Sequence, residues 1–164
     1  MLLFVIALFS STASAAALPP ASWQPCCGPA DTLCASWRTV SISPAAPQAG
    51  DTLFVNATGA MGVGAVLASP PLAAGAVAAF HNGADVFDAS IATCGESSFS
   101  VLGMSTVIVN ALACPTVNGG PAALSITFPL PSLAAGMGAF NVSINGTDNT
   151  GRLVAFCIDV LVSL

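Results

Sequence analysis

The chain has 164 residues, of which 55% are hydrophobic and 5% are charged, against about 25% charged residues in an ordinary globular domain. With two arginines, no lysine and a net charge of −5, it cannot build the basic face that nucleic-acid binding requires, and it is not attracted electrostatically to an anionic membrane. The length suits one domain, and much of the apolar content is alanine and glycine, so the interior must either collapse tightly or leave a hollow.

The N-terminus has the features of a secretory signal. Residues 2–9 form an apolar run, and Ala13-Ser14-Ala15 follows as a small-x-small cleavage site. A membrane anchor is the alternative, but the run is shorter than the ~20 residues that span a bilayer. We therefore expect residues 1–17 to be a signal peptide, followed by a lead-in over residues 18–34 and one domain over residues 35–164.

If the protein is secreted, its cysteines are expected to form disulfides. An even number of cysteines in an oxidising compartment predicts that all of them are paired, and the count alone leaves the pairing open. A zinc site is the alternative, which the single histidine, His81, and the absence of a Cys-x-x-Cys pair disfavour. The proline- and cysteine-rich lead-in is expected to lie across the outside of the domain, tied by disulfides. The six cysteines are Cys26, Cys27, Cys34, Cys94, Cys114 and Cys157.

Apolar and polar side chains alternate in two short runs around a proline-rich turn. Val40 and Ile42 alternate with serines, and Leu53, Val55 and Ala57 occupy every second position of residues 52–58. This period of two predicts half-buried strands. The two prolines and the Gly-Asp pair between the runs predict the turn that joins them.

The same period recurs along the rest of the chain. His81-Asn82-Gly83 predicts a hairpin turn between residues 76–80 and 86–93, because Asn-Gly is a strong turn signal. Between Cys94 and Cys114, residues 107–109 predict either an extra strand or part of a helix. About seven short strands without a clear helix predict an antiparallel β-sandwich. The remaining expected strands are residues 122–128, 140–145 and 154–162, with Asp159 and Cys157 facing outward in the last.

Three N-glycosylation sequons begin at Asn56, Asn141 and Asn145. In each case the alternation places the asparagine on the outer, polar face. The stretch from Gly59 to Gly75 is rich in glycine yet apolar for a loop. It predicts either the rim of a pocket or a segment that packs against the sheet.

Catalytic motifs are missing from the sequence. It has no Gly-x-Ser-x-Gly and no phosphate-binding loop, and His81 is expected to be a turn residue. Asp85 and Asp88 stand three residues apart on a predicted strand and should face opposite sides, which disfavours a glycosidase-like pair. We therefore expect no enzyme activity, no cofactor, no metal and no nucleic-acid partner.

Five short segments along residues 27–164 form a pattern: Ser43-Pro44 with Pro47 and Gly50, Asn56-Ala57-Thr58, Cys94 with Cys114-Pro115, Pro131 with Gly138-Ala139-Phe140, and Val154 to Val160 around Cys157. Together and in this order they resemble the ML lipid-recognition family, which includes cholesterol-transfer and phosphatidylglycerol/phosphatidylinositol-transfer proteins. The chain departs from the family pattern in a longer Cys…Cys-Pro loop and in Phe140, which replaces a tyrosine.

The resemblance implies an immunoglobulin-like sandwich that holds a lipid tail in an apolar cavity between its sheets. It also implies a Cys94–Cys114 bridge and a Cys27–Cys157 bridge, which leaves Cys26 with Cys34. The implied cargo is a sterol or a phospholipid, and the absence of lysine favours a weakly charged lipid. The protein would then be a monomer that meets donor and acceptor membranes transiently, either secreted or in the lumen of a lysosome or vacuole.

Two alternatives remain open at this point. One is a structural or lipid-recognition surface glycoprotein with a filled sandwich core, and the other is a sensor that passes microbial lipid to a receptor. Each residue that is a candidate for lining the cavity could instead simply pack in the core of the sandwich without contacting a lipid. The candidates for lining the cavity are Leu53, Val55, Phe87, Ile91, Leu124, Ile126, Phe128, Phe140, Val142, Ile144, Phe156, Ile158 and Val160.

Overall fold

The fold is known from a computed structural model that describes residues 20–28, 30–64, 74–101, 103, 105–116, 118–132, 138–147 and 154–164. The expected signal peptide at residues 1–17 lies outside the described residues. So do residues 65–73 of the apolar glycine-rich stretch. None of the described residues belongs to a helix that is long and apolar enough to cross a membrane.

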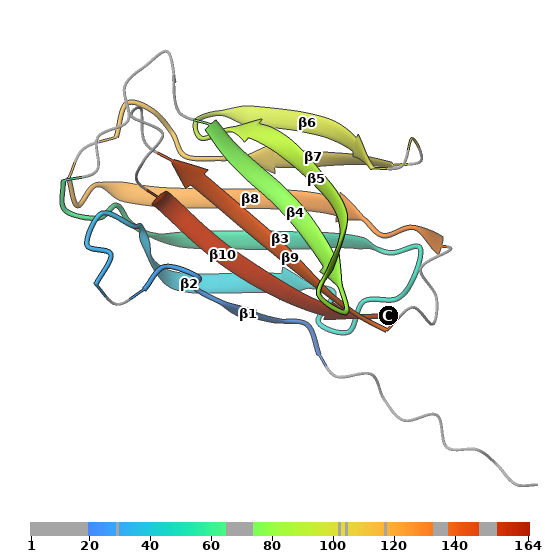
Figure 1. Cartoon of the computed structure of the whole chain (residues 1–164). Coiled ribbons are helices and arrows are strands. Elements are labelled where there is room, and N and C mark those ends of the chain that lie inside the picture. Colours follow the sequence, from blue (N-terminus) through green and yellow to red (C-terminus); the bar gives the residue numbers. More distant parts are fainter. Residues whose placement is uncertain are drawn as a thin grey trace, which may run out of the picture.

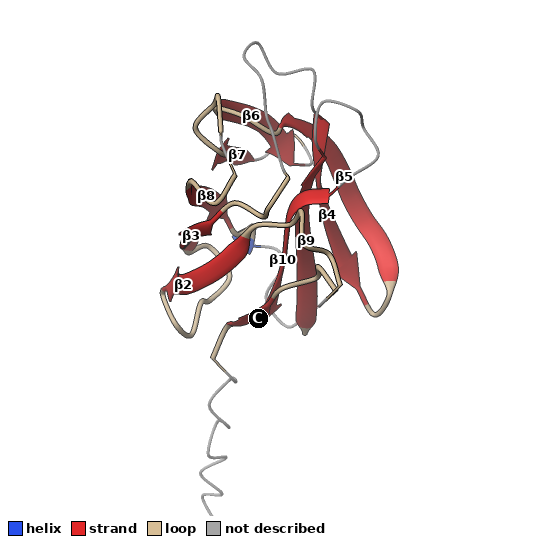
Figure 2. Ribbon diagram, turned by 90° about the vertical axis from the view of Figure 1, so that its left-hand side faces the viewer, coloured by secondary structure: helices blue, strands red, loops and turns tan. Residues whose placement is uncertain are grey.

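Two five-stranded antiparallel sheets face each other as two layers (Figures 1 and 2). This arrangement confirms the expected all-β sandwich. In spatial order, the first sheet consists of β1 (Ser22–Gln24), β10 (Val154–Ser163), β9 (Ala139–Thr147), β4 (Ala74–His81) and β5 (Ala84–Ala92). The second sheet consists of β2 (Ser36–Ser43), β3 (Thr52–Ala60), β8 (Pro121–Pro129), β7 (Ser105–Asn110) and β6 (Glu96–Val101).

The alternation of side chains sets which face of each strand is buried. In β3, Leu53, Val55 and Ala57 are at most 2% exposed, whereas Phe54 and Asn56 are exposed. The ladder aligns Val55 with inward-facing partners on both neighbouring strands, so the buried positions form continuous rows across the sheet. The predicted inward faces of residues 52–58, 122–128 and 154–162 are confirmed in this way.

The segment between Cys94 and Cys114 is a hairpin of two strands, β6 and β7, of which only β7 was expected as a possible strand. Gly103 has a positive φ in the tight turn between them. β6 was missed because three of its six residues are serine, which weakens its apolar signal. The lead-in also contributes a strand, since β1 adds to the edge of the first sheet beside β10.

The disulfides are Cys26–Cys157, Cys27–Cys34 and Cys94–Cys114. The expected Cys94–Cys114 bridge is confirmed, and the expected Cys27–Cys157 and Cys26–Cys34 bridges are wrong. The register of β1 explains the difference. It pairs Trp23 with Val160 and Gln24 with Asp159, and its continuation brings Cys26 opposite Cys157.

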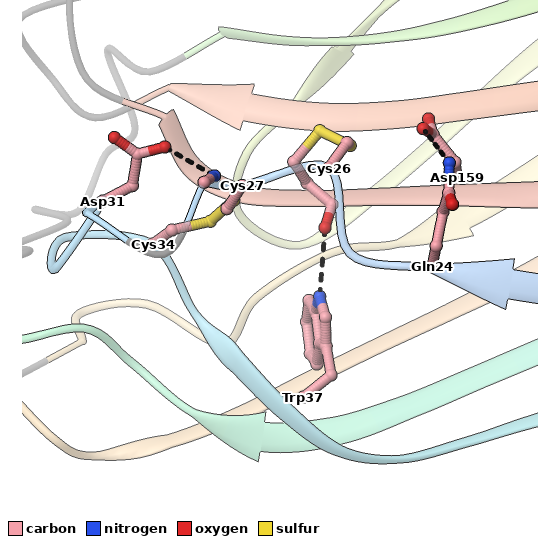
Figure 3. The surroundings of a disulfide bond; sticks show 9 residues. Gln24, Cys26, Cys27, Asp31, Cys34, Trp37 and Asp159 are labelled. Atoms are coloured by element: carbon pink, nitrogen blue, oxygen red, sulfur yellow. Dashed lines mark hydrogen bonds between the residues drawn. A yellow bond between two sulfur atoms is a disulfide. The ribbon is translucent and has the colours of Figure 1, made fainter.

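Cys157 faces the same side of β10 as Asp159, as expected, yet it is only 9% exposed. Its side chain is bonded to Cys26, the disulfide drawn in Figure 3, which accounts for the low exposure. The prediction that Cys157 faces outward therefore holds for the direction of the side chain and fails for its exposure.

Backbone bonds and disulfides join the two sheets at one end of the sandwich, which we call the disulfide end. The amide of Ala35, just before β2, donates to the carbonyl of Ala155 in β10 over 2.8 Å. Cys94–Cys114 links the end of β5 to the segment after β7. The opposite end, which we call the turn end, contains the β2–β3 turn and the β4–β5 turn at Asn82-Gly83.

Candidate functional site

The candidate lining residues all lie in one apolar layer between the sheets. All of them except Phe87 and Phe140 are buried, and those two are half-buried against the same core. The first sheet supplies Phe87, Ile91, Phe140, Val142, Ile144, Phe156, Ile158 and Val160, and the second sheet supplies Leu53, Val55, Leu124, Ile126 and Phe128.

Charge is absent from this layer. Within the described part of the chain, the buried polar side chains are Thr93 and Thr116, and both lie outside the named strands. The Thr93 hydroxyl donates to the carbonyl of Thr147 over 3.1 Å, at the disulfide end. A molecule between the sheets would therefore be bound by apolar contact and not by ion pairs.

The middle of the layer is filled by side chains of the protein. Phe156 and Ile158 are 0% exposed and Ile144 is 1% exposed. The ring of Phe156 lies over Gly146 on the neighbouring strand, where a Cβ atom would come within 2.6 Å of Cζ. Because position 146 carries no side chain, the Phe156 ring can occupy that space.

Three phenylalanines join the two sheets along their β5–β6 edge, and we call them the phenylalanine seam. Phe87 of β5 stacks on Phe128 of β8, with ring centroids 6.2 Å apart, and lies 5.9 Å from Phe99 of β6. Phe87 and Phe99 are only half-buried. The apolar layer therefore reaches the protein surface at this seam.

Side chains, and not a backbone ladder, close the seam. Among the described strands, β5 forms a ladder only with β4, and β6 only with β7, although β5 and β6 are neighbours. Phe99 was not among the sequence-based candidates. The alternation of Phe99 and Val101 with serines was the available signal.

Phe140 lies near the turn end, away from the centre of the layer. The centroid of its ring is 5.0 Å from the centroid of the His81 ring, and the two ring planes are tilted by 35°. The Nδ1 atom of His81 is 3.2 Å from the carbonyl oxygen of Ala139, and Asn82 contacts Nε2 at 3.0 Å. His81 is the last residue of β4 and not a turn residue as expected, and both of its ring nitrogens are engaged locally beside the hairpin turn.

Asp85 and Asp88 do not face opposite sides of β5, in contrast to the expectation. The register pairs Asp88 with Ala78 and Asp85 with the residue two positions further along β4. A bulge in β5 adds one residue between them and changes the alternation, so both carboxylates lie on one face, and both are exposed. The described residues contain no group of three or more His, Cys, Asp or Glu side chains placed to bind a metal ion.

A separate hollow of about 260 Å³ lies where β1 leads into β2, on the edge of the sandwich away from the seam. It is lined by Trp23, Pro25, Trp37, Asp31 and the Cys27–Cys34 disulfide, among others. Figure 3 shows Trp37 pointing from β2 toward the Cys26–Cys157 bridge of the other sheet. We call this feature the tryptophan hollow. The sequence did not indicate a pocket here.

The three sequon asparagines differ in exposure. Asn56 is exposed on the outer face of β3, whereas Asn141 and Asn145 on β9 are half-buried. β9 is a central strand with neighbours on both sides, which accounts for the lower exposure of its outward side chains.

The sequence matches no protein-family model and no curated protein.

Proposed function

We propose that the protein is a lipid carrier, which binds the apolar part of a sterol or phospholipid between its two sheets without catalysing a reaction. The observation that carries this proposal is an uncharged apolar layer that reaches the surface at the phenylalanine seam. The segments that resemble the ML family support the same function.

The energetics of the layer suit such a cargo. Each CH₂ group that a lipid buries between the sheets would contribute about 0.8 kcal/mol, so even a short tail would bind tightly. No charged side chain of the described inner faces would have to be desolvated. Recognition would rest on the shape and length of the apolar group.

Access is proposed to occur by parting of the seam. Three aromatic rings have to separate there, and no backbone ladder between β5 and β6 has to break. The disulfide end would remain joined through Ala35–Ala155 and Cys94–Cys114. Because the net charge is −5, transient contact with a membrane would depend on the half-buried rings of the seam and not on attraction to anionic headgroups.

One observation favours the alternative of a structural or recognition glycoprotein with a filled core. Phe156, Ile158 and Ile144 leave almost no exposed surface at the centre of the layer. A carrier must move these side chains apart when a lipid enters, whereas a structural sandwich keeps them in place.

Mass spectrometry of lipids extracted from the folded, secreted protein separates the two functions. A stoichiometric sterol or phospholipid is expected for a carrier. A lipid-free protein that also fails to bind labelled sterol and labelled phospholipid would leave the filled-core glycoprotein.

The variant Val142→Trp tests whether the cargo lies in the layer. Val142 is 8% exposed on the inner face of β9, so an indole there should occupy the space that an entering lipid would need and abolish uptake of the labelled lipid. Phe54→Trp is the control, because Phe54 is 46% exposed and lies on the outer face of β3. Circular dichroism would establish that both variants are folded. Equal uptake by both folded variants would place the cargo elsewhere.

A further inference from the structure

The tryptophan hollow is a second place where the molecule has the features of a binding site. It contains both tryptophans of the chain, which lie on the edge strands of different sheets. Each is half-buried, so part of each indole remains accessible. The hollow is distinct from the layer of lining candidates between the sheets, none of which contributes to it.

Local contacts position the walls of the hollow. The indole N–H of Trp37 donates to the carbonyl of Cys157 over 3.4 Å, and its ring meets Phe156 edge-on with centroids 6.5 Å apart. The β1–β10 ladder fixes Trp23 opposite Val160. These contacts orient the Trp37 indole and fix the backbone position of Trp23 before any ligand arrives.

Asp31 supplies the charge of the site. Its Oδ2 atom accepts the amide N–H of Gly28 over 2.8 Å, inside the short loop that the Cys27–Cys34 disulfide closes (Figure 3). Backbone bonds from Asp31 to Gly28 and from Cys34 to Asp31 hold the same loop. The second carboxylate oxygen has no protein partner among the described residues and is available to a ligand.

The composition of the lining selects a particular kind of ligand. Asp31 is the only ionisable side chain among the residues that form the hollow, and neither arginine of the chain is among them. The negative net charge of −5 also favours a cation. A metal ion or a primary ammonium needs several oxygen acceptors to replace its water, and Asp31 is the one carboxylate in this lining.

A quaternary ammonium group has no N–H donors to satisfy, and it binds to aromatic faces beside a carboxylate. The volume of about 260 Å³ is slightly below the range of about 300–1,000 Å³ for drug-sized ligands, so it suits one small group. We propose that the tryptophan hollow binds a quaternary ammonium group of the choline type. This group occurs both in free choline and in the headgroup of phosphatidylcholine.

Tryptophan fluorescence of the wild-type protein is a specific reporter. The chain contains no tyrosine, and both of its tryptophans line the hollow. Titration with choline chloride and with tetramethylammonium chloride is expected to produce a saturable change. The neutral isostere 3,3-dimethylbutan-1-ol and sodium chloride at equal concentration are the controls. An equal response to the isostere, or no saturable response to choline, would overturn the proposal.

Asp31→Asn and Asp51→Asn form a matched pair of variants. Each removes one negative charge from an aspartate whose Oδ2 accepts an amide N–H three residues earlier over 2.8 Å. Asp51 lies in the β2–β3 turn, outside the hollow. Asp31→Asn should weaken choline binding roughly fivefold, as expected for the loss of one nearby charge, while Asp51→Asn should leave it unchanged. Equal affinities of the two variants would contradict the role of Asp31.

Vesicles distinguish the two sources of the ligand. If the site takes a lipid headgroup, phosphatidylcholine vesicles should produce the choline-type fluorescence change, and phosphatidylglycerol vesicles should not. If the site takes only the free cation, choline alone should produce it. Lipid that co-purifies with the protein and is insensitive to both choline and Asp31→Asn would support carriage between the sheets. If such lipid co-purifies and choline causes no change in fluorescence, the ammonium site is refuted while the proposed lipid carriage still stands.

Discussion

Gly146 lies on the inner face of β9, directly opposite Phe156 in the ladder with β10. A Cβ atom at position 146 would stand 2.6 Å from Cζ and 3.0 Å from Cδ1 of the Phe156 ring, and closer still to Cε1. The ordinary van der Waals range begins at 3.4 Å. The substitution Gly146→Ala therefore forces the ring to move, although the Asn145 sequon remains intact because its middle position accepts alanine.

The expected cost follows from how little freedom the ring has. Phe156 is 0% exposed, and Trp37 packs edge-on against it. Adding a methyl group to such a packed core costs about 1–3 kcal/mol. The replacement of glycine by alanine restricts the unfolded chain and offsets about 0.4–1 kcal/mol of this cost. We expect Gly146→Ala to lower the free energy of unfolding by about 1–2 kcal/mol.

A double-mutant cycle measured by urea unfolding with the disulfides intact tests the cause. Phe156→Leu removes the ring atoms that the new methyl group would meet, at a cost of its own of about 1–2 kcal/mol. The double variant should therefore lose less unfolding free energy than the sum of the losses in the two single variants, by a coupling energy on the order of 1 kcal/mol. Strict additivity, or a Gly146→Ala variant as stable as the wild type, would refute the steric argument.

Two further predictions concern the covalent features of the secreted protein. Asn56→Gln should reduce the mass of the protein by one glycan, because Asn56 is exposed on an outer face. An unchanged mass would mean that this sequon is unoccupied. Cys26→Ser should leave a free thiol at Cys157, since the β1 register holds Cys26 and not Cys27 opposite it. Thiol labelling followed by peptide mapping checks this, and a label on Cys34 instead would show that Cys27 can replace Cys26.

Most of the fold could be predicted from the sequence because a strand with one buried face leaves a period of two in the side chains. Leu53, Val55 and Ala57 were assigned inward by this rule, and all three are buried. The hairpin at Asn82-Gly83 could be predicted as well, because the left-handed backbone at both positions suits these residue types. Such features depend on neighbours close in sequence.

Features that depend on how distant segments align could not be predicted in this way. The expected cysteine pairing was wrong by one residue, because only the register between β1 and β10 selects Cys26 as the partner of Cys157. A single bulge in β5 likewise placed Asp85 and Asp88 on the same face. The spacing of residues in the sequence does not reveal a bulge or a strand register. One extra residue in a strand moves every later side chain to the opposite face of the sheet.

The sequence by itself determined that this protein is a β-sandwich with an uncharged interior, because its alternating pattern and its scarcity of charged residues permit little else. The tertiary structure alone decided where that interior reaches the surface and what lies on the opposite edge. Phe87 and Phe99 come from different sheets, as do Trp23 and Trp37. In each case two consecutive strands, β5 and β6 or β1 and β2, enter different sheets, and their side chains come together only when the edges of the two packed sheets face each other.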